Sequence, residues 1–565
     1  MSSSPSATRP SIALLILIGL FILLTWAFVQ SQILSSYGGI TKSLPTEKNK
    51  TVVESATVSS IDDNRVTNVA NEYKEYIHST VSNHWNSSRS IAIPDGHPRG
   101  KKPFKQRWVH LDLKGAPPRV SYLSRLFPLL PRLGVTGLVI EWEDSFPYEG
   151  RLSILKAPHA YTKGDVEEIL RLANVSSLEV VPLIQSFGHL EFVLKHDRFA
   201  HLRERVTEES SICPSRDESV PLIRDMIKQM RKFHPHSTRI HIGADEAYYV
   251  GEDVHCRIRL NNELNQNVER LKLDHIAKVA RSALEEGFTE VLAWNDMFDR
   301  ASVELMREVQ LGALITPVVW GYAEDVTRED YFPKGLFTRL SHVFDKIWFA
   351  SAYKGANGQG NVFISIDRYL ANQRSYARLY RDFEKDLYPR LEGIILTGWS
   401  RFSHRQPLCE LLPSSLPSIV LNLIYLDDVT ATAKLISTKT KDFLACPSNP
   451  SPGLYEAKEY NQSIFYPPKE QIFTQCVFPS SDLFTAIQEL GFLNWKSSKV
   501  TTEIEKERLK FNTNVLQMQS KIRPLLSSVL FDDAVDEFLQ SKVNSLILSK
   551  PTPPPPESIP LQEPL

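Results

Sequence analysis

The sequence predicts an α/β protein built around a (β/α)8 TIM barrel, and three observations support this prediction. Eight short apolar runs rich in β-branched residues are spread over residues 107–401. Amphipathic segments of helical length lie between most of them. No G-x-G-x-x-G motif follows the first run, which argues against a dinucleotide site and weakens the alternative of a doubly wound open sheet. Apolar strands that alternate with helices are typical of a parallel sheet covered on both faces, and eight of them are typical of a barrel.

Each predicted strand is a run of this kind. In chain order the runs cover residues 107–115, 135–143, 179–188, 238–246, 290–298, 312–322, 346–355 and 391–401. The clearest helical segments are residues 164–175, after the second run, and 366–388, after the seventh. Beyond residue 425 the alternation ends, and residues 501–548 carry an apolar stripe among charges. This stripe predicts a helical region packed on the barrel.

The composition is that of a globular protein with balanced charge. Of 565 residues, 65 are Lys or Arg and 66 are Asp or Glu, so the formal net charge is −1. No nucleic-acid partner is therefore expected, because such proteins normally carry a basic patch. Aromatic residues make up 10% of the chain and include nine Trp. They fit either a large core or a site that stacks flat apolar faces.

The N-terminal segment Ile12–Val29 is apolar and uncharged over 18 residues. That length just allows a helix to span a bilayer, and it exceeds the about 7–15 apolar residues of a typical signal peptide. We therefore expect an uncleaved signal anchor that attaches the chain to a membrane. The predicted organisation is a cytoplasmic tail at 1–11, the anchor at 12–29, a polar stalk at 30–103, the barrel at 104–425, a helical C-terminal region at 426–550 and a Pro-rich tail at 551–565.

Glycosylation motifs indicate the side of the membrane on which the barrel lies. Four N-x-S/T sequons, at Asn49, Asn86, Asn174 and Asn461, all follow the predicted anchor. The sequence thus predicts a glycosylated, single-pass type II membrane protein of the secretory pathway with a luminal barrel. The Golgi is the expected compartment.

The five cysteines show no metal-binding spacing. They contain no C-x-x-C pair, and the ends of the predicted strands show no H-x-H or H-E-x-x-H spacing, so neither a metal nor another cofactor is expected. Cys446 and Cys476 flank a Pro-rich stretch and are expected to form a disulfide in an oxidising environment. The odd number leaves at least one free thiol or an intermolecular bond.

Polar and aromatic side chains stand where the predicted strands end. They are Asp112; Glu141 and Glu143; Gln185, His189 and Glu191; Asp245 and Glu246; Trp294 and Asp296; Trp320 and Tyr322; Tyr353; and Trp399 and Arg401. Active sites of such barrels lie at the carboxyl ends of the strands, so we expect these side chains to converge. Carboxylates framed by Trp and Tyr suit a sugar, because aromatic rings pack on its apolar face while carboxylates bind hydroxyls and carry protons. A phosphate site would need Gly-rich loops and cations, of which this set has few.

The adjacent pair Asp245 and Glu246 ends the fourth predicted strand. Two neighbouring carboxylates repel each other, and burial strengthens the repulsion. Either one carboxyl holds a proton, or an electropositive group belongs between them.

The motif HIGADE at residues 241–246 resembles the His-x-Gly-x-Asp-Glu pattern of family 20 glycoside hydrolases, the β-N-acetylhexosaminidases. KGAPPRVSYL (114–123), QSFGHLEFVLK (185–195) and TGWSRFSH (397–404) resemble segments of the hexosaminidase D-like branch of that family. The resemblance covers roughly residues 104–425, with the motifs in the expected order. It implies a retaining exo-β-N-acetylhexosaminidase that removes terminal β-linked GalNAc or GlcNAc from glycoconjugates.

The resemblance also implies substrate-assisted catalysis, in which the oxygen of the substrate's 2-acetamido group attacks the anomeric carbon and gives an oxazolinium-like intermediate. Glu246 is then the general acid and afterwards the general base. Asp245 orients the acetamido N–H and stabilises the developing positive charge. On this scheme the reacting substrate is the electropositive group, and an ionised Asp245 is expected to raise the pKa of Glu246.

Further substrate contacts are expected from the other strand ends. The implied set consists of Trp294, Trp320 and Trp399 as aromatic walls, Asp296 with Tyr322 or Tyr353 as hydrogen-bond partners, and His189 and Glu191 as additional contacts. Lysosomal members of the family use a Glu two residues after the Trp of strand 8, where this chain has Arg401. The contacts to the 4- and 6-hydroxyls are therefore expected to differ, with a changed preference between gluco and galacto sugars.

Other interpretations stay open at this point. The barrel is alternatively a catalytically inactive, lectin-like module that binds amino sugars, or a glycosidase of another barrel family with two separated carboxylates. Core packing is the better explanation of each Trp when it is taken alone. His241, inside a strand, is expected to be a buried structural histidine. A homodimer is a further expectation.

Overall fold

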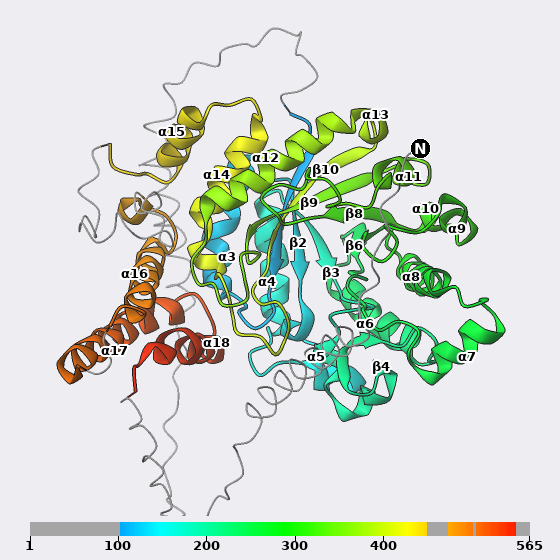
Figure 1. The fold of residues 1–565 in the computed structure, drawn as a ribbon, viewed down its shortest axis with the longest axis horizontal. Coiled ribbons are helices and arrows are strands. Elements are labelled where there is room, and N and C mark those ends of the chain that lie inside the picture. The colour runs from blue at the N-terminus through cyan, green and yellow to red at the C-terminus, as the bar shows by residue number, and fades with distance from the viewer. Residues whose placement is uncertain (1–101, 449–472, 501–503, 550–565) are drawn as a thin grey trace, which may run out of the picture. The chain divides into compact units, whose positions relative to one another are not determined.

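The computed structural model describes residues 102–448, 473–500 and 504–549, all of which belong to one compact unit, Pro94–Leu565. Eight parallel strands form a closed barrel in the order β1-β10-β9-β8-β7-β6-β3-β2 (Figure 1). The strands are β1 (Gln106–Asp112), β2 (Gly137–Glu141), β3 (Glu179–Leu183), β6 (Arg239–His241), β7 (Glu290–Trp294), β8 (Thr316–Trp320), β9 (Ile347–Lys354) and β10 (Leu391–Gly398). Seven of them lie within the run predicted to contain them, and β1 begins one residue before its run.

The first strand decides between a barrel and an open sheet, because it is paired on both sides. Asp112 at its end lies opposite Glu141 of β2, and Val109 lies opposite Leu396 of β10. A doubly wound sheet would leave its edge strands unpaired on one side. The predicted TIM barrel is therefore confirmed, and the open-sheet alternative is excluded.

The barrel interior is filled by alternate side chains of the strands. Inward-facing positions hold one buried cluster: Trp108, Val139, Val181, Leu183, Leu292, Trp294, Val318, Trp348, Ala350 and Ile395. Neighbouring positions such as Val109, Leu138 and Ile140 belong to the larger cluster between strands and helices. Both faces are thus apolar, which explains why the strands read as nearly continuous apolar runs.

Helices surround the barrel (Figure 1). Those between the strands are α3 (Val120–Leu126), α4 (Lys163–Val175), α5 (Glu191–Leu194), α6 (Ser219–Phe233), α7 (Val254–Asn262), α8 (Val268–Glu285), α9 (Val303–Glu308), α10 (Leu311–Leu314), α11 (Leu336–Ser341), α12 (Ile366–Asp382) and α13 (Glu384–Leu387). A capping box of Thr162 and Asp165 starts α4, as its sequence favours. The predicted helix 366–388 is divided at Phe383, which ends α12 and precedes α13. A short antiparallel hairpin, β4 (Arg203–Arg205) and β5 (Glu208–Ile212), follows α5.

After the last strand the described chain is helical. Its helices are α14 (Leu416–Asp427), α15 (Ala433–Phe443), α16 (Ser481–Ser497), α17 (Glu505–Ser527) and α18 (Asp532–Phe538). The segment around α18 contacts the loop that follows β1: Arg119 donates to the carbonyl of Ser527 at 2.9 Å and to Asp532 at 3.0 Å. The predicted helical packing against the barrel is present in this part.

No helix among residues 102–448, 473–500 and 504–549 combines the length and the apolar character needed to cross a membrane. The longest, α17, has 23 residues but carries charges such as Lys506, Glu507 and Arg508, and a spanning helix needs about 20 mostly apolar residues. This finding contradicts the predicted localisation as a type II membrane protein of the secretory pathway, with the Golgi as compartment, and we withdraw it. The membrane partner and the glycoprotein assignment have no support either.

Several predictions fall outside the described residues. These are the tail at 1–11, the anchor at 12–29, nearly all of the stalk at 30–103, the Pro-rich tail at 551–565 and the sequons at Asn49, Asn86 and Asn461. Asn174 lies exposed near the end of α4. The domain boundaries remain predictions, and the homodimer has no support.

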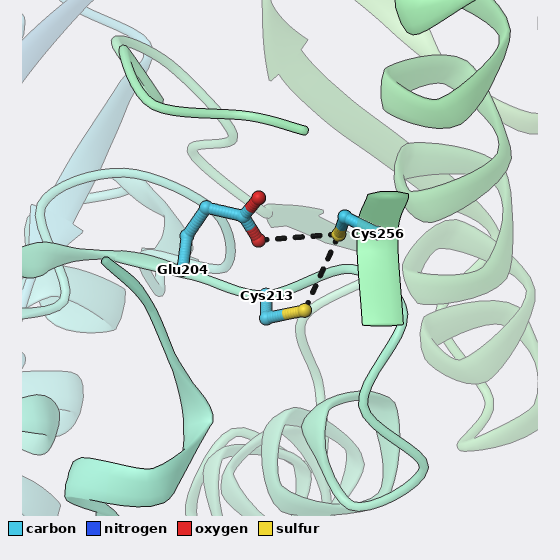
Figure 2. A group of neighbouring side chains, drawn as sticks. All are labelled: Glu204, Cys213 and Cys256. Carbon is cyan, nitrogen blue, oxygen red and sulfur yellow. Dashed lines mark hydrogen bonds between the residues drawn. The ribbon is translucent and has the colours of Figure 1, made fainter. Parts of the chain in front are cut away.

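The cysteines divide into one bonded pair and three thiols. Cys446 and Cys476 form the expected disulfide. Cys213, Cys256 and Cys409 are free and buried. Two of these thiols, Cys213 and Cys256, face each other beside the carboxylate of Glu204 (Figure 2).

Candidate active site

A cavity of 430 Å³ lies at the carboxyl ends of the barrel strands. Its wall is formed by Lys114, Gln185, His189, Asp245, Glu246, Trp294, Trp320, Tyr322, Ala323, Arg328, Tyr331, Gly355, Ala356, Arg368, Trp399, Arg401 and Phe402. Nine of these residues belong to the side chains predicted at the strand ends, and so the strand ends converge as expected.

The loop that carries Asp245 and Glu246 leaves β6 in an unusual backbone conformation. Gly243, Ala244 and Glu246 all have positive φ, at 60°, 67° and 47°. Left-handed backbone at a residue other than glycine costs free energy and is found mostly at functional sites. The loop also packs closely on its neighbour, since a Cβ atom at Gly188 would lie 2.1 Å from the carbonyl oxygen of Asp245. A glycine is therefore required at position 188.

His189 lies against both carboxylates. Its Nε2 atom is 3.1 Å from Oε2 of Glu246 and 3.4 Å from Oδ2 of Asp245. Burial alone would lower the pKa of His189, but the Asp245 and Glu246 carboxylates outweigh it and hold the pKa well above its ordinary value. The imidazole is thus positioned to carry a positive charge beside the pair.

The pKa of Glu246 differs from the expectation. Burial raises its pKa, but hydrogen bonds with His189 and Tyr248 outweigh burial and lower the pKa below the ordinary value. The expectation that Asp245 raises the pKa of Glu246 is therefore wrong for the site without substrate. No local pattern indicated this, because His189 reaches the pair from the segment that follows β3.

Asp296 holds the loop that carries Glu246 through a hydrogen bond. Its Oδ2 atom accepts the backbone N–H of Glu246 at 2.9 Å, and its Oδ1 atom accepts the indole N–H of Trp320 at 2.9 Å. Burial, and then the nearby Asp245 carboxylate, raise the pKa of Asp296 to about 7. In contrast, Oδ1 of Asp245 has no hydrogen-bond partner among the described residues. Of these two carboxyl groups, only Asp245 offers a free acceptor to the cavity.

Aromatic rings form the walls around the carboxylates. The ring of Trp399 lies 6.1 Å from that of Trp294 and 6.1 Å from that of Tyr322, and Tyr322 stacks on Trp320 at 5.2 Å. These four side chains were all predicted from the strand ends. They give the cavity flat apolar faces on several sides.

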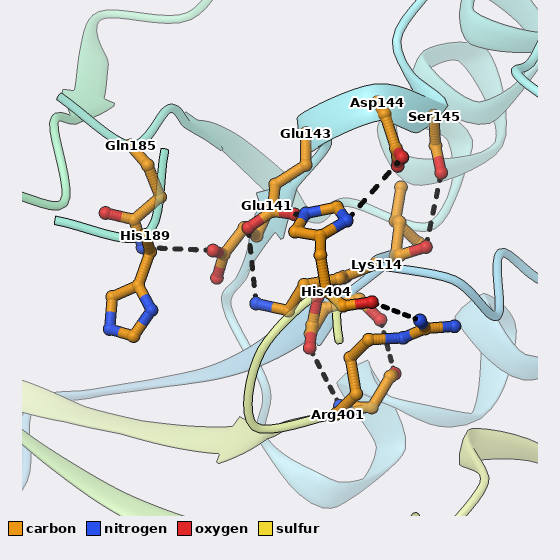
Figure 3. A network of polar contacts seen from close by, with 12 residues as sticks. Lys114, Glu141, Glu143, Asp144, Ser145, Gln185, His189, Arg401 and His404 are labelled. Carbon is orange, nitrogen blue, oxygen red and sulfur yellow. Dashed lines mark hydrogen bonds and ion pairs between the residues drawn. The ribbon is translucent and has the colours of Figure 1, made fainter. Parts of the chain in front are cut away.

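A buried network of charges lies beside the cavity, centred on Lys114 (Figure 3). The Lys114 ammonium donates to Glu143 at 3.2 Å and lies 5.9 Å from the ring centre of Trp399. Burial would lower the pKa of Lys114, but Asp112, Glu143 and other carboxylates raise it well above its ordinary value. The cation is therefore held permanently charged at the cavity wall. Sequence reasoning missed it, although it directly follows the first strand.

Two carboxylates of β2 and its following turn complete this network. Glu143 lies 2.6 Å from Nε2 of His404 (Figure 3). Glu141 lies 3.0 Å from Nε2 of His110 and accepts from the side-chain amide of Gln185 at 3.0 Å. Burial would raise the pKa of Glu141, but Lys114 and these two hydrogen bonds lower it. Both carboxylates are thus engaged within the protein.

Arg401 lines the cavity, but its guanidinium is held by other parts of the chain. One nitrogen donates to Glu537 of α18 at 2.6 Å and another to the carbonyl of His404 at 3.3 Å. A Cβ atom at Gly115 would lie 1.9 Å from this guanidinium, so glycine leaves it room. A residue of α18 therefore holds a side chain of the cavity wall in place, which the sequence did not indicate.

Two further cations were missed because they lie on long loops and helices and not at strand ends. Arg368 donates to the carbonyls of Tyr322 and Ala356 at 3.2 and 2.9 Å. Arg328 is exposed, with its guanidinium 5.0 Å from the ring centre of Tyr331. The cavity thus holds more positive charge than the strand ends suggested.

Three predicted contacts are not part of the cavity wall: Asp296, Tyr353 and Glu191. Tyr353 is fully buried and donates its hydroxyl to the carbonyl of His110 at 3.1 Å. Glu191 begins α5, is buried, and is not part of the cavity wall. His241 is buried as predicted, accepts the N–H of Gly243 at 3.0 Å and packs on Trp294.

Two groups of potential metal ligands occur among the described residues: Glu204 with Cys213 and Cys256, and Glu143 with Asp144 and His404. In the second group the carboxylates also pair with lysines, Glu143 with Lys114 and Asp144 with Lys195. A second, wider hollow of 620 Å³ lies along residues 147–163. Its Glu149 carboxylate is engaged by Lys163 and Lys232, so it offers no comparable pair.

Similarity to known proteins agrees with this geometry. Residues 137–330 match the catalytic domain of glycosyl hydrolase family 20. The chain is 42% identical to human (Homo sapiens) hexosaminidase D over 323 residues, 57% of this chain and 65% of that protein. It is 42% identical to hexosaminidase D of Bos taurus over 321 residues, 56% of this chain and 90% of that protein. Neither name describes a membrane protein.

Among solved structures, the β-N-acetylhexosaminidase of Bacteroides fragilis shares 16% identity over 58% of this chain and 67% of that one, with a TM-score of 0.44. That likeness is too low to support conclusions about the site. The family assignment rests on the bovine relative, because this chain covers most of that protein. The chain therefore belongs to glycosyl hydrolase family 20, as its resemblance to the hexosaminidase D-like branch predicted.

Proposed function

We propose that the protein is a retaining exo-β-N-acetylhexosaminidase (EC 3.2.1.52) that removes terminal β-linked GalNAc or GlcNAc from glycoconjugates. The observation that carries the proposal is the position of Asp245 and Glu246. Both line a cavity of 430 Å³ whose remaining walls include four aromatic rings. A cavity of this volume suits a single terminal sugar, which is the residue that an exo-acting enzyme removes.

Glu246 is the proposed general acid and base. Together with His189 it holds one proton, which rests on the imidazole before substrate enters. A sugar ring that fills the cavity displaces water from Glu246, and loss of water favours the protonated carboxyl. The proton then lies on Glu246, where it reaches the leaving oxygen of the glycosidic bond.

Asp245 is the proposed partner of the 2-acetamido group. Its Oδ1 atom has no hydrogen-bond partner among the described residues, and the residue as a whole is 6% exposed. A free acceptor in so dry a place suits the acetamido N–H, which gains positive charge as the acetamido oxygen attacks the anomeric carbon. Trp294, Trp320 and Trp399 are proposed to hold the sugar face and the acetamido methyl.

The other carboxylates argue against a two-carboxylate mechanism. Asp296 uses both oxygens, one for the Glu246 N–H and one for Trp320. Glu141 and Glu143 are buried and bound to His110 and His404. A nucleophilic carboxylate must reach the anomeric carbon, and none of the three is free to do so. The substrate's own acetamido oxygen is therefore the proposed nucleophile.

Two isosteric variants test the proposal on aryl glycosides of GlcNAc and GalNAc. We expect Glu246→Gln and Asp245→Asn each to lower kcat/KM by about 10²–10⁴-fold. Because a good leaving group needs little acid, the loss in Glu246→Gln should shrink on dinitrophenyl glycosides, whereas the loss in Asp245→Asn should not. A thiazoline analogue of the N-acetyl sugar should inhibit the wild type.

Other outcomes would favour the alternatives. Binding of N-acetyl sugars by a folded protein without hydrolysis would indicate the lectin-like module. Hydrolysis that resists the thiazoline would indicate a two-carboxylate enzyme. Equal inactivity of the folded wild type on both sugars, without binding, would exclude the proposed substrate class.

A further inference from the structure

A buried group of two thiols and two carboxylates lies behind the loop that carries Glu246. Cys213 follows β5 and Cys256 lies in the first turn of α7, with their Sγ atoms 3.3 Å apart (Figure 2). The Sγ of Cys256 is 3.2 Å from Oε2 of Glu204, and that of Cys213 is 3.5 Å from Oδ1 of Asp253. Neither cysteine has exposed surface.

The two sulfur atoms are close to bonding distance. A disulfide has an S–S length of about 2.0 Å, so the Sγ atoms have only about 1 Å left to close. Cys213 and Cys256 point toward each other (Figure 2).

The remaining cysteines leave this pairing as the natural one. Cys446 and Cys476 are already bonded, so the chain is compatible with disulfide chemistry. Cys409 stands alone, with its Sγ 3.3 Å from the carbonyl oxygen of Ser400. A bond between Cys213 and Cys256 would leave a single free thiol and account for the odd number of cysteines.

We propose that Cys213 and Cys256 form a second disulfide. In this step the two thiols lose two protons and two electrons to a low-molecular-weight disulfide such as oxidised glutathione, which becomes two thiols. Since both cysteines are buried in the folded protein, the exchange takes place in the folding chain, before α7 packs against the segment after β5. A hydrogen bond with Cys256, together with burial, also raises the pKa of Cys213, and this disfavours exchange once the site is closed.

A metal ion is the competing occupant, because Oε2 of Glu204 and both Sγ atoms lie within 4.8 Å of one another. A tetrahedral ion needs a fourth ligand. The Oγ atom of Ser215 lies 3.2 Å from the Sγ of Cys256, but a hydroxyl is not a usual zinc ligand. The carboxylate beside Cys213 is that of Asp253, whose Oδ2 accepts from Arg216 at 2.8 Å and whose Oδ1 caps α7 by accepting the N–H of His255 at 2.8 Å. Because both oxygens of Asp253 already accept hydrogen bonds, Asp253 is a poor fourth ligand for a metal ion. We therefore favour the sulfur–sulfur bond over a metal site.

The proposed bond would link two segments that contact the loops of His189 and Glu246. The N–H of Ile212, next to Cys213, donates to the carbonyl of Phe187 at 3.0 Å, two residues before His189. On the other side, Oε1 of Glu204 accepts the N–H groups of Gly251, Glu252 and Asp253 at 2.7, 2.7 and 3.0 Å. A covalent link between these segments restrains the Glu246 loop relative to His189.

Peptide mapping tests the proposal directly. The full chain is purified without reductant, denatured in N-ethylmaleimide and digested with trypsin. We expect peptides 206–216 and 240–257 to be joined through Cys213 and Cys256 and to separate on reduction. The proposal is overturned if both cysteines are alkylated, even after refolding in glutathione buffer. A bond from either one to Cys409 would overturn it too.

Matched variants separate a disulfide from a metal site. Cys213→Ser and Cys256→Ser keep a hydrogen-bond donor, and Cys409→Ser is the control. We expect reductant to lower the Tm of wild type and Cys409→Ser by several degrees more than that of either of the other two. Zinc bound at one ion per chain and lost in Cys213→Ser, with no cross-linked peptide, would instead establish a metal site and exclude the disulfide.

Discussion

The guanidinium of Arg401 donates to the carboxylate of Glu537 at 2.6 Å, which joins the end of the last barrel strand to α18. Arg401 is 8% exposed and lines the cavity, so this ion pair positions a cavity-wall side chain from outside the barrel. We expect Glu537→Gln to raise KM by about 3–10-fold with little change in kcat, because the wall loosens while the acid–base pair is untouched. Steady-state kinetics on aryl glycosides measures both constants.

The neighbouring residue provides the control for that change. Asp536 pairs with Arg523 at 2.8 Å on an exposed part of α18. Asp536→Asn removes the same charge from the same helix, and exposed pairs contribute little. If Asp536→Asn raised KM as much as Glu537→Gln, the effect would come from net charge, and the positioning role of Glu537 would be refuted.

His189 should set the alkaline limit of activity. Wild-type protein loses the shared proton of the His189–Glu246 pair only as pH rises through the raised pKa of His189. In His189→Gln the proton is held by Glu246 alone, so we expect the alkaline limb of kcat/KM to move to lower pH. We also expect kcat to fall by about 10–100-fold. A pH–rate profile with an unmoved alkaline limb would contradict the shared proton.

Glu410 should make the fold less stable as pH rises. It is fully buried behind the cavity wall, where Tyr369 donates to Oε2 at 2.6 Å while Oε1 has no hydrogen-bond partner among the described residues. Burial raises its pKa to about 7. The folded state thus holds a proton that the unfolded chain releases near pH 4.5, so the stability is complete below pH 4.5 and is lost as pH rises through 7.

Glu410→Gln should remove this dependence. The amide reproduces the protonated carboxyl, so the variant should unfold at higher temperature than the wild type at pH 8, by about 3 kcal/mol in free energy of unfolding, and match it near pH 4.5. Calorimetry at both pH values provides the measurement. Asp296, whose pKa is also raised to about 7, keeps a residual slope in the variant. Equal slopes in both proteins would show that Glu410 is ionised in the fold.

Trp320 should matter for its N–H as well as for its ring. Trp320→Phe removes the donor to Asp296, which supports the Glu246 loop. The indole N–H of Trp399, in contrast, has no hydrogen-bond partner among the described residues. We therefore expect Trp320→Phe to lower kcat/KM by about tenfold, and more than Trp399→Phe does. The reverse order would mean that the aromatic faces alone decide the effect.

The barrel was predictable because its strands are apolar on both faces and its period is regular. The same regularity placed Trp294, Trp320, Trp399 and the carboxylate pair at one rim. Tyr353 was predicted as a substrate contact because it lies near the end of a strand. Its side chain instead points into the core, toward His110.

The positions of the charges could not be predicted in this way. Lys114 lies two residues past the predicted strand-end residue Asp112, but its role depends on Glu143 and Trp399, which follow other strands. Glu537 stands in a helix that no local pattern connects to Arg401. Such pairs are created by tertiary contacts, and a single sequence contains no signal for them.

The pairing of β1 with β10 has a consequence for the order in which the protein matures during synthesis. Ser400 donates to Asp112 at 2.8 Å, so the first and last strands close the rim together. Asp245 and Glu246 leave the ribosome long before this seam exists, and Glu537 follows later still. The nascent chain therefore carries its acidic pair without a complete cavity until the last strand has been synthesised.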